Sequence, residues 1–426
     1  MTSADSAPSA AVTVVGVGAD GWSGLTTGAR DALRRAQVVI GGARQLALLP
    51  DECPGERVAW PSPLRPAVPR LLAEHEGRRV CVLASGDPMF YGIGRALAEV
   101  AGPGRLSVLP HPSSVSYACA RLGWPVEETE VVTLVGRPAE SLAAVLHEGR
   151  RVLVLSAGAG TPAQVAGLLR ERGFGPTPMR VLEQLGGEGE GQFAGTAEEW
   201  TRPPGDPLNV IALECRSQGE RPRLSLVPGL PDEAYSHDGQ LTKRHVRAVT
   251  LAALAPAPGE TLWDVGGGAG SVAVEWMRAH RSCRAVCVER DPDRASRIAR
   301  NAGTLGVPAL HVVTAAAPGA LADPRLPVPD AVFIGGGLTA PGLLRACWDA
   351  LPDGGRLVAN AVTLESEAVL ADGHRRFGGE LFRLAVSQAV PVGGFTGWRQ
   401  AMPVTQWSVT KSGQRGDLRD AGGEEA

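Results

Sequence analysis

The stretch ETLWDVGGGAGSVAVEW, residues 260–276, decides the fold of the second half of this chain. An apolar strand at residues 261–265 runs into a set of glycines, and a helix is predicted at residues 271–279. This order of strand, glycine loop and helix is typical of Rossmann-like folds, where helix N–H groups face a bound cofactor. The predicted cofactor contacts are Asp264, Gly266, Gly267, Gly268, Ala269 and Gly270.

The next predicted strand, residues 284–289, ends in an acidic residue. Glu289 follows Gly266 at close to the roughly 20-residue spacing of an acid that binds ribose hydroxyls. The glycine pattern is G-x-G-x-G, whereas most dinucleotide sites have G-x-G-x-x-G. It resembles the loop of class I methyltransferases, and that resemblance implies S-adenosylmethionine as the cofactor.

Small residues follow two further predicted strands of this half. In TAAAPGAL, residues 314–321, Ala316 and Ala317 are expected to lie against the adenine ring. In FIGGG, residues 333–337, glycines stand where such enzymes hold their substrate. Neither stretch has the N/D-P-P-Y/F signature for methylating an exocyclic base nitrogen, which argues against a nucleic-acid substrate.

An amphipathic helix is predicted to begin just after Thr242, upstream of the glycine loop. Thr242 is either an ordinary N-cap or a cofactor contact. Lys243, Arg244 and His245 follow in the first helical turn, where the helix dipole disfavours cations. They form either a solvated face or a site for an anionic ligand, and the residues alone leave both readings open.

The first half opens on a second strand and glycine loop, VTVVGVGADGWSG at residues 12–24. No acid ends the strand predicted at residues 37–40, so a dinucleotide site is not expected. Another strand, at residues 79–84, runs into SGDP and then into an aromatic pair flanked by glycines. Asp87 in this segment is either a simple cap or part of a packed ligand wall.

Five stretches of the first half carry a more specific signal. They are VVGVGADG (14–21), ASGDPMFYGIG (84–94), HPSSVSYACARLGW (111–124), LSAGAGTPAQVAGLLRERG (155–173) and PLNVIAL (207–213). Together they resemble the tetrapyrrole methylase family, whose class III fold binds S-adenosylmethionine in a cleft between two α/β lobes. The second half resembles the methyltransferase that acts on the same pathway. In this order, over residues 12–410, the chain is similar to the family of fused precorrin C5,15-methyltransferases (decarboxylating) of cobalamin biosynthesis.

The resemblance implies two S-adenosylmethionine sites in each chain. In the first half it implies contacts at Ala19, Ser85, Gly86, Asp87, Phe90, Ser113, Ser114, Ala157 and Gly195. In the second half the matching positions are Thr242, Gly266 to Gly270, Glu289, Ala316 and Ala317. Many family members have proline where this chain has Ala19, so the opening loop departs from the family pattern.

The resemblance also implies a reaction. Precorrin-6B would be methylated at C5 by the first half and at C15 by the second, with decarboxylation of the C12 acetate to give precorrin-8X. Since the macrocycle carbons are already nucleophilic, the protein mainly orients the donor methyl, an effect of about 7–11 kcal/mol. The candidates to bind the substrate carboxylates are Lys243, Arg244 and His245 in the second half, with Arg44 and Arg137 in the first. No catalytic base is identified.

Short β-branched runs alternate with helical segments throughout, which predicts an α/β protein. We expect an N-terminal two-lobed class III tetrapyrrole methylase fold at residues 12–213. A linker at residues 214–236 would lead to a C-terminal Rossmann-like class I methyltransferase fold at residues 237–410. Residues 1–11 and 411–426 are predicted to be disordered tails.

Composition narrows the function. A net charge of −3 gives no electrostatic case for a nucleic-acid or membrane partner. No apolar run approaches the roughly 18 residues of a membrane span, and the first residues lack a signal-peptide pattern. The 7 cysteines are scattered without a C-x-x-C pair, which predicts buried thiols in a reducing cytoplasm and neither disulfides nor a metal site.

Two other functions compete with this reading. An RNA methyltransferase would be expected to carry a basic stripe or an added RNA-binding module. A scaffold with one active half would be expected to lose one of the two loops, and both are intact. We therefore predict a cytoplasmic enzyme that binds a tetrapyrrole and has no nucleic-acid or membrane partner. The resemblance further implies a homo-oligomer formed through the C-terminal domain.

Overall fold

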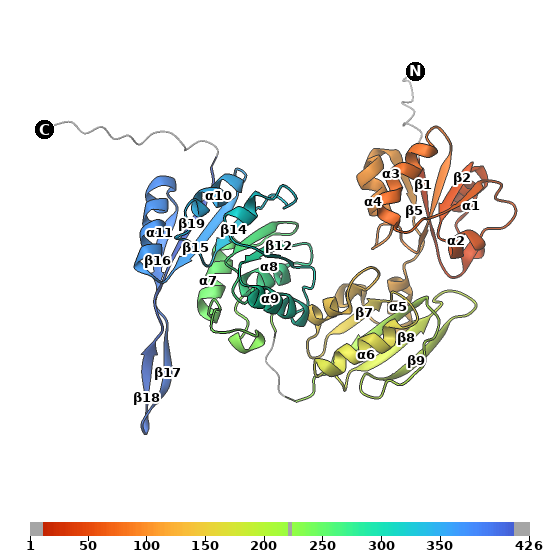
Figure 1. Cartoon of the computed structure of the whole chain (residues 1–426). Coiled ribbons are helices and arrows are strands. Elements are labelled where there is room, and N and C mark those ends of the chain that lie inside the picture. Colours follow the sequence, from red (N-terminus) through yellow and green to blue (C-terminus); the bar gives the residue numbers. More distant parts are fainter. Residues whose placement is uncertain (1–11, 220–223, 413–426) are drawn as a thin grey trace, which may run out of the picture. The chain divides into compact units, whose positions relative to one another are not determined.

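The computed structural model describes residues 12–219 and 224–412 and has two compact units, with the boundary after Glu220 (Figure 1). Residues 140–146 group with the second unit. The tail predicted at residues 1–11 and most of that predicted at residues 411–426 lie outside the described residues. Both units are mixed α/β, as the sequence predicts.

The first unit begins with a five-stranded parallel sheet in the order β3-β2-β4-β1-β5. Its strands are β1 (Val12–Val17), β2 (Val38–Gly41), β3 (Glu56–Ala59), β4 (Val80–Ser85) and β5 (Leu106–Leu109). Its helices are α1 (Thr27–Arg35), α2 (Ala43–Ala47), α3 (Leu64–Glu74) and α4 (Gly94–Ala101). Because all strands are parallel, the loops that follow β1, β4 and β5 meet at one edge of the sheet.

A second, mixed sheet completes this unit in the order β6-β7-β10-β8-β9. Its strands are β6 (Glu130–Thr133), β7 (Arg151–Leu155), β8 (Pro178–Glu183), β9 (Gly191–Thr196) and β10 (Asn209–Glu214). The helices are α5 (Ser114–Leu122) and α6 (Thr161–Glu171). The two sheets give the unit the two α/β lobes that the sequence predicts.

The second unit is built on a seven-stranded sheet in the order β13-β12-β11-β14-β15-β19-β16, in which β19 runs antiparallel to its neighbours. Its strands are β11 (Thr261–Val265), β12 (Arg284–Glu289), β13 (His311–Thr314), β14 (Ala331–Ile334), β15 (Arg356–Ala361), β16 (Glu380–Leu384) and β19 (Val404–Thr410). The helices are α7 (Arg244–Leu254), α8 (Ser271–Ala279), α9 (Pro292–Thr304), α10 (Leu343–Ala350) and α11 (Leu364–Phe377). The predicted helix at residues 271–279 is confirmed as α8.

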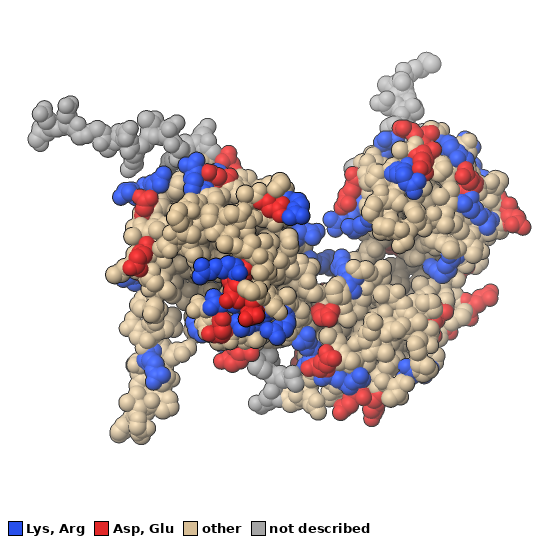
Figure 2. Space-filling view, viewed as in Figure 1, with Lys and Arg blue, Asp and Glu red and all other residues tan. Residues whose placement is uncertain are grey.

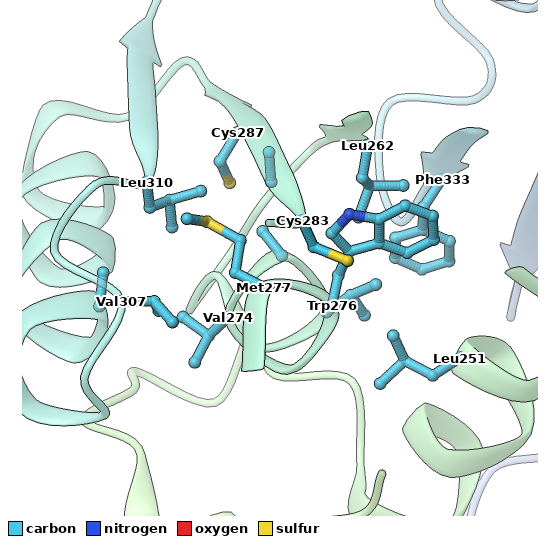
Figure 3. Close-up of a cluster of buried hydrophobic side chains, with 14 of the residues drawn as sticks. Leu251, Leu262, Val274, Trp276, Met277, Cys283, Cys287, Val307, Leu310 and Phe333 are labelled. Atoms are coloured by element: carbon cyan, nitrogen blue, oxygen red, sulfur yellow. The ribbon is translucent and has the colours of Figure 1, made fainter. Parts of the chain in front are cut away.

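The central strand β11 is buried on both faces, which explains why most of its residues are apolar. Leu262 packs with Trp276 of α8 and Phe333 of β14 in one cluster (Figure 3). Trp263 and Val265 point to the opposite face, into the cluster that contains residues of α10 and α11. The sheet therefore lies between two helical layers, and the carboxyl ends of its parallel strands share one edge.

One hairpin lies outside this sheet. β17 (Ser387–Val392) and β18 (Phe395–Gln400) pair only with each other, and Figure 1 shows them extending from the sheet of the second unit. Phe395 is 84% exposed and Trp398 is 79% exposed. The sequence analysis did not predict this hairpin, because its residues have no buried face that would produce an apolar alternation.

The predicted linker at residues 214–236 is shorter in the structure. Cys215 is buried in the first unit, where its N–H donates to the carbonyl oxygen of Arg150 at 2.9 Å. Leu230 and Tyr235 are buried in the core of the second unit. Most of the segment thus belongs to the two compact units, and residues 220–223 lie outside the described residues.

All seven cysteines are free and buried. Among the described residues, no three His, Cys, Asp or Glu side chains gather in a way that could hold a metal ion. No helix within residues 12–219 and 224–412 has the length and apolar character that a bilayer crossing requires.

Candidate functional site

The glycine loop of the second unit joins β11 to α8. The N–H groups of Gly266 and Gly267 donate to the carbonyl oxygen of Val288 at 2.9 and 3.2 Å. Gly266, Gly268 and Gly270 have φ values of 76°, 58° and 74°, in the left-handed region that favours glycine. The backbone path of the loop therefore requires glycine at alternate positions.

Close packing requires glycine here as well. A Cβ at Gly266 would lie 2.7 Å from the backbone of Gly336, and a Cβ at Gly267 would lie 2.2 Å from the Sγ atom of Cys287. The groups nearest to these two glycines are parts of the protein itself. The fold itself therefore requires glycine at both positions, which were predicted as cofactor contacts.

Residues 236–243 cross this loop. A Cβ at Gly268 would lie 2.9 Å from the carbonyl oxygen of Gln240, so the crossing segment touches the loop directly. The carbonyl oxygen of Thr242 accepts a hydrogen bond from the buried guanidinium of Arg247, which fixes the end of the segment. Thr242 thus lies two residues after the contact with the loop, and its role as a cofactor contact stays a prediction.

Helix α7 follows this segment and begins at Arg244, one residue later than predicted with Thr242 as the N-cap. Lys243, and not Thr242, occupies the N-cap position of α7, and its side chain makes no capping hydrogen bond. The N–H of Arg244 instead donates to Oδ1 of Asp232 at 3.0 Å. Lys243, Arg244 and His245 are all exposed. Their role as ligands for substrate carboxylates stays a prediction.

Glu289 ends β12 beside the loop and is only 5% exposed. Its Oε2 accepts from the N–H of Gly268 at 2.9 Å, and its Oε1 accepts from the N–H of Asp291 at 3.0 Å. A carboxylate oxygen accepts more than one hydrogen bond, so both oxygens retain capacity for hydroxyl donors. The carboxylate, the glycine loop and the crossing segment therefore fit a ribose-bearing cofactor.

Asp264 lies beneath the loop and is 1% exposed. Its Oδ2 accepts from the N–H of Ala273 in the first turn of α8, at 3.1 Å. Burial raises the pKa of Asp264 to about 7, and the nearby charge of Glu289 acts in the same direction. The structure places this carboxyl against the start of α8, and in that position it supports the loop from below.

The predicted adenine and substrate segments meet the same edge of the sheet. The N–H of Ala315 donates to the carbonyl oxygen of Glu289 at 3.1 Å, which brings Ala316 and Ala317 beside that strand end. The N–H of Gly335 donates to the carbonyl oxygen of Val265 at 2.9 Å. The structure thus brings together the residues predicted for the second site.

In the first unit the SGDP segment follows β4 and meets the start of α5. The N–H of Gly86 donates to the carbonyl oxygen of Val17 at 3.0 Å, and a Cβ at Gly86 would lie 3.2 Å from the Cα of Ser113. The Oγ atom of Ser85 accepts from Nε2 of Gln45 at 3.0 Å. Ser85, Gly86 and Ser113 are therefore neighbours, as predicted.

Several residues of this site also have a local structural role. Oδ1 of Asp87 accepts from the N–H two residues further along, at 2.8 Å, which is the cap that the sequence analysis left open. Oγ of Ser113 caps α5, accepting from the N–H three residues on at 3.1 Å, and Ser114 is the first residue of that helix. Phe90 is 39% exposed, so its ring is available to a ligand.

A cavity of about 310 Å³ opens beside the loop that follows β1. Its lining consists of Ala19, Asp20, Ser23, Gln184, Gly186, Glu188 and Gly189. Ala19 was predicted to contact the cofactor, whereas the residues of the loop after β8 were not. Gly186 has a φ of 82°. The sequence could have indicated this residue, because a glycine cluster follows β8 just as glycine loops follow β1 and β11.

Gly195 is separated from the rest of the predicted site. The sheet register pairs Gly195 with Met179, near the start of β8, whereas Ala157 follows the far end of β7. A Cβ at Gly195 would lie 3.4 Å from the ring of Trp200. The glycines that share a cavity with Ala19 are Gly186 and Gly189, whereas Gly195 does not line it.

The two arginines suggested for the first site have different surroundings. Nη2 of Arg44 donates to Oγ of Ser85 at 3.3 Å, and burial lowers the pKa of its guanidinium. The guanidinium of Arg137 lies 5.6 Å from the centre of the Tyr91 ring. Arg44 is therefore next to Ser85 of the SGDP segment. Arg137 is next to Tyr91, which belongs to the aromatic pair that follows SGDP.

Two family models match the chain. The model for Tetrapyrrole (Corrin/Porphyrin) Methylases matches residues 11–201, and the model for a Precorrin methyltransferase domain matches residues 233–411. The precorrin-6Y C(5,15)-methyltransferase (decarboxylating) of Mycobacterium tuberculosis is 50% identical over 403 residues, which cover 94% of this chain and 100% of that relative. The protein of the same name from Sinorhizobium sp is 48% identical over 400 residues, 94% of this chain and 96% of that one.

A solved structure also matches the chain. It is the C-terminal domain of a precorrin-6Y C5,15-methyltransferase from Rhodobacter capsulatus, 50% identical, which covers 44% of this chain and 100% of that domain with a TM-score of 0.42. The family matches confirm the predicted pair of methyltransferase folds and the use of S-adenosylmethionine. Because full-length relatives match over 94% of its residues, the chain belongs to the family of precorrin-6Y C5,15-methyltransferases (decarboxylating).

Proposed function

We propose that this chain methylates precorrin-6B at C5 and C15 and decarboxylates its C12 acetate side chain, giving precorrin-8X in cobalamin biosynthesis. The observation that carries the proposal is the 50% identity over 94% of the chain to a relative that is named for both methylations and for the decarboxylation. The match includes both units, so neither unit is an unrelated addition.

Each unit would perform one of the two transfers. We assign C5 methylation to the first unit, and C15 methylation with decarboxylation to the second. The different folds of the two units support a division of labour, since each has its own sheet edge with glycine loops and small residues. Each edge would bind one S-adenosylmethionine, so a chain would bind two.

In the second unit, S-adenosylmethionine would supply a methyl group activated by its positively charged sulfur. Glu289 would hold the ribose hydroxyls, since its two oxygens have free acceptor capacity. The segment that ends at Thr242 would lie over the bound molecule. Arg247 fixes this segment, because it donates to the carbonyl oxygen of Thr242 and to Asp232. Lys243, Arg244 and His245 would bind carboxylates of the substrate.

In the first unit, the cofactor would lie along the edge formed by the loops after β1, β4, β5 and β8. Ala19 and Gly186 line the cavity there, and Ser85, Gly86 and Ser113, which are neighbours, would contact the same cofactor. Arg44 would bind a substrate carboxylate beside Ser85. These residues would mainly position the two reactants, an effect that can contribute about 7–11 kcal/mol.

Mass spectrometry of the product made from precorrin-6B tests the proposal. The purified full-length chain with S-adenosylmethionine should give a product that has gained two methyl groups and lost one carbon dioxide. A product with a single methyl group and an intact acetate would contradict the proposal, as would methylation of RNA at a comparable rate.

Two variants test the assignment of each reaction to a unit. Ala157→Trp places a large side chain at an exposed position of the first site and should remove only the C5 methyl group. Glu289→Ala should remove the C15 methyl group together with the decarboxylation. The reverse pattern would show that the assignment is wrong while leaving the overall reaction intact.

We also propose that the chain forms a homo-oligomer through its second unit, in the cytoplasm and without a nucleic-acid partner. The hairpin β17–β18 supports the oligomer, because its surface is almost uncharged in Figure 2 and includes the exposed Phe395 and Trp398. Exposed aromatic side chains of this size are typical of protein interfaces. The net charge of −3 supports the absence of nucleic acid.

A further inference from the structure

Buried His111 and part-buried Asp20 form a pair at the first site, and neither residue was among its predicted contacts. Nε2 of His111 is 3.1 Å from Oδ2 of Asp20, across 91 residues of sequence. Asp20 belongs to the loop after β1, and His111 follows β5, the neighbouring parallel strand. His111 is 7% exposed, so the contact is shielded from water.

The contacts of His111 fix its ring beside Asp20. Its Nδ1 is 3.1 Å from the carbonyl oxygen of Pro112, and its Nε2 faces Oδ2 of Asp20. The ring is therefore held at both nitrogens, and it holds the Asp20 side chain in turn.

The glycines of the opening loop make room for this pair. A Cβ at Gly18 would lie 2.6 Å from Cε1 of His111 and 2.5 Å from Oδ1 of Asp20, and a Cβ at Gly24 would lie 1.8 Å from Oδ2 of Asp20. A Cβ at Gly16 would lie 2.6 Å from the backbone nitrogen of His111. The loop is therefore built around the pair, which holds the Asp20 carboxylate at one place beside the cavity.

Asp20 is one of the residues that line the cavity of about 310 Å³. Its Oδ1 atom is buried and has no hydrogen-bond partner within the described structure. Glu188 also lines this cavity, and none of the described lining residues is Lys, Arg or His. The charge of Asp20 also helps to raise the pKa of Tyr117, after the larger effect of burial.

An anionic cavity suits only one of the two reactants. The tetrapyrrole carries many carboxylates, which the charges of Asp20 and Glu188 repel. S-adenosylmethionine carries a positively charged sulfur, and its product S-adenosylhomocysteine does not. We propose that Asp20, held in place by His111, is a further binding residue of the first site, and that with Glu188 it makes this site prefer the charged donor to its spent product.

This inference rests on the proposed function, because it takes the cavity to be the first of two donor sites. Titration calorimetry of the full-length chain with S-adenosylmethionine, and separately with S-adenosylhomocysteine, tests it. Asp20→Asn should weaken donor binding at one of two sites by about tenfold, which corresponds to one charge-assisted contact. Product binding at that site should change less, and the site in the second unit serves as an internal control.

Three further variants keep the test decisive if Asp20→Asn folds poorly. Glu188→Gln changes an exposed residue and should reduce the same preference in part. His111→Gln keeps a donor toward Asp20 and should retain the preference, whereas His111→Leu leaves the carboxylate unpaired and should lose it. Asp51→Asn, at an exposed turn outside the cavity, is the matched control and should change neither affinity.

The failures of the two proposals are distinguishable. Two donor sites in the unaltered chain, with donor affinities that Asp20→Asn and Glu188→Gln leave unchanged, would overturn the role of Asp20 alone. A chain that binds no donor in its first unit would overturn the two-site proposal together with this one. Equal weakening of donor and product binding would also contradict the charge preference.

Discussion

Asp264 shows how a single residue couples the core to the second site. Its carboxyl lies beneath the glycine loop, and it accepts a hydrogen bond from Ala273 at the start of α8. Burial raises its pKa to about 7, so the folded protein holds a proton that the unfolded chain releases near pH 4. The residue therefore stabilises the fold most when it is neutral.

Asp264→Asn tests this coupling. Because the folded-state pKa lies above the unfolded-state value, the stabilisation is present below about pH 4 and is lost as the pH rises toward 7. Relative to the variant, the unaltered chain should lose up to about 4 kcal/mol between pH 4 and pH 8. Urea unfolding at several pH values measures this, with the exposed Asp353→Asn as control, and parallel pH profiles would contradict it.

Gly266→Ala tests the requirement for glycine in the loop. An alanine at this φ of 76° costs about 1–2 kcal/mol, and its Cβ would also lie 2.7 Å from the backbone of Gly336. Gly259→Ala is the matched control, because Gly259 has a φ of 94° but no atom within 4 Å of its Cβ position. We expect thermal unfolding to show a larger loss for Gly266→Ala, and equal losses would rule out the packing argument.

At the scale of elements, α7 is held by a buried network and not by a cap of its own. Nε of Arg247 donates to Oε1 of Glu275 at 2.5 Å, and its Nη1 donates to Oδ1 of Asp232 at 3.2 Å. Arg247 also binds the carbonyl oxygens of Leu230 and Thr242. One guanidinium thus joins α7 and α8 to the segment that crosses the glycine loop.

Arg247→Met should destabilise the second unit by about 3–5 kcal/mol, because it leaves Glu275 as an unpaired buried charge. Combining it with Glu275→Leu should recover much of the loss, since both charges are then removed. Arg345→Gln breaks an exposed pair with Asp349 and should cost less than about 1 kcal/mol. Chemical unfolding measures all three, and a double variant as unstable as Arg247→Met would refute the account.

At the scale of the whole molecule, the hairpin β17–β18 stands apart, because it forms a separate two-stranded sheet. It pairs with no strand of the seven-stranded sheet, and Arg399 is its single charged residue. An apolar hairpin of this kind is stabilised when another surface covers its side chains. A second copy of the chain would provide that surface.

Replacing Phe395 and Trp398 with serine should reduce the size of the assembly, because it removes the largest apolar side chains of the proposed interface. Light scattering after size-exclusion chromatography measures the mass of the particle. Leu364→Ser is the control, since Leu364 is 80% exposed on α11 and lies outside the hairpin. An unchanged mass for the double variant would place the interface elsewhere.

Short-range patterns predicted much of the architecture. The strands predicted at residues 261–265 and 284–289 match the structure residue for residue, because buried strands are rich in apolar residues. β3 and β9 were missed, since β3 is mostly exposed and β9 is an edge strand with a polar alternation. The N-cap of α7 was misplaced by one residue because its capping partner, Asp232, lies outside the helix.

The sequence by itself determined the two α/β units, their order, the glycine loops and the acid at Glu289. These features follow from local periodicity and from spacings within one strand, loop and helix unit. Only the tertiary structure decided that His111 holds Asp20, that Arg247 holds Glu275 and that Gly186 shares a cavity with Ala19. Each of these contacts joins segments far apart in the chain, and no local pattern encodes which buried charge will meet which partner.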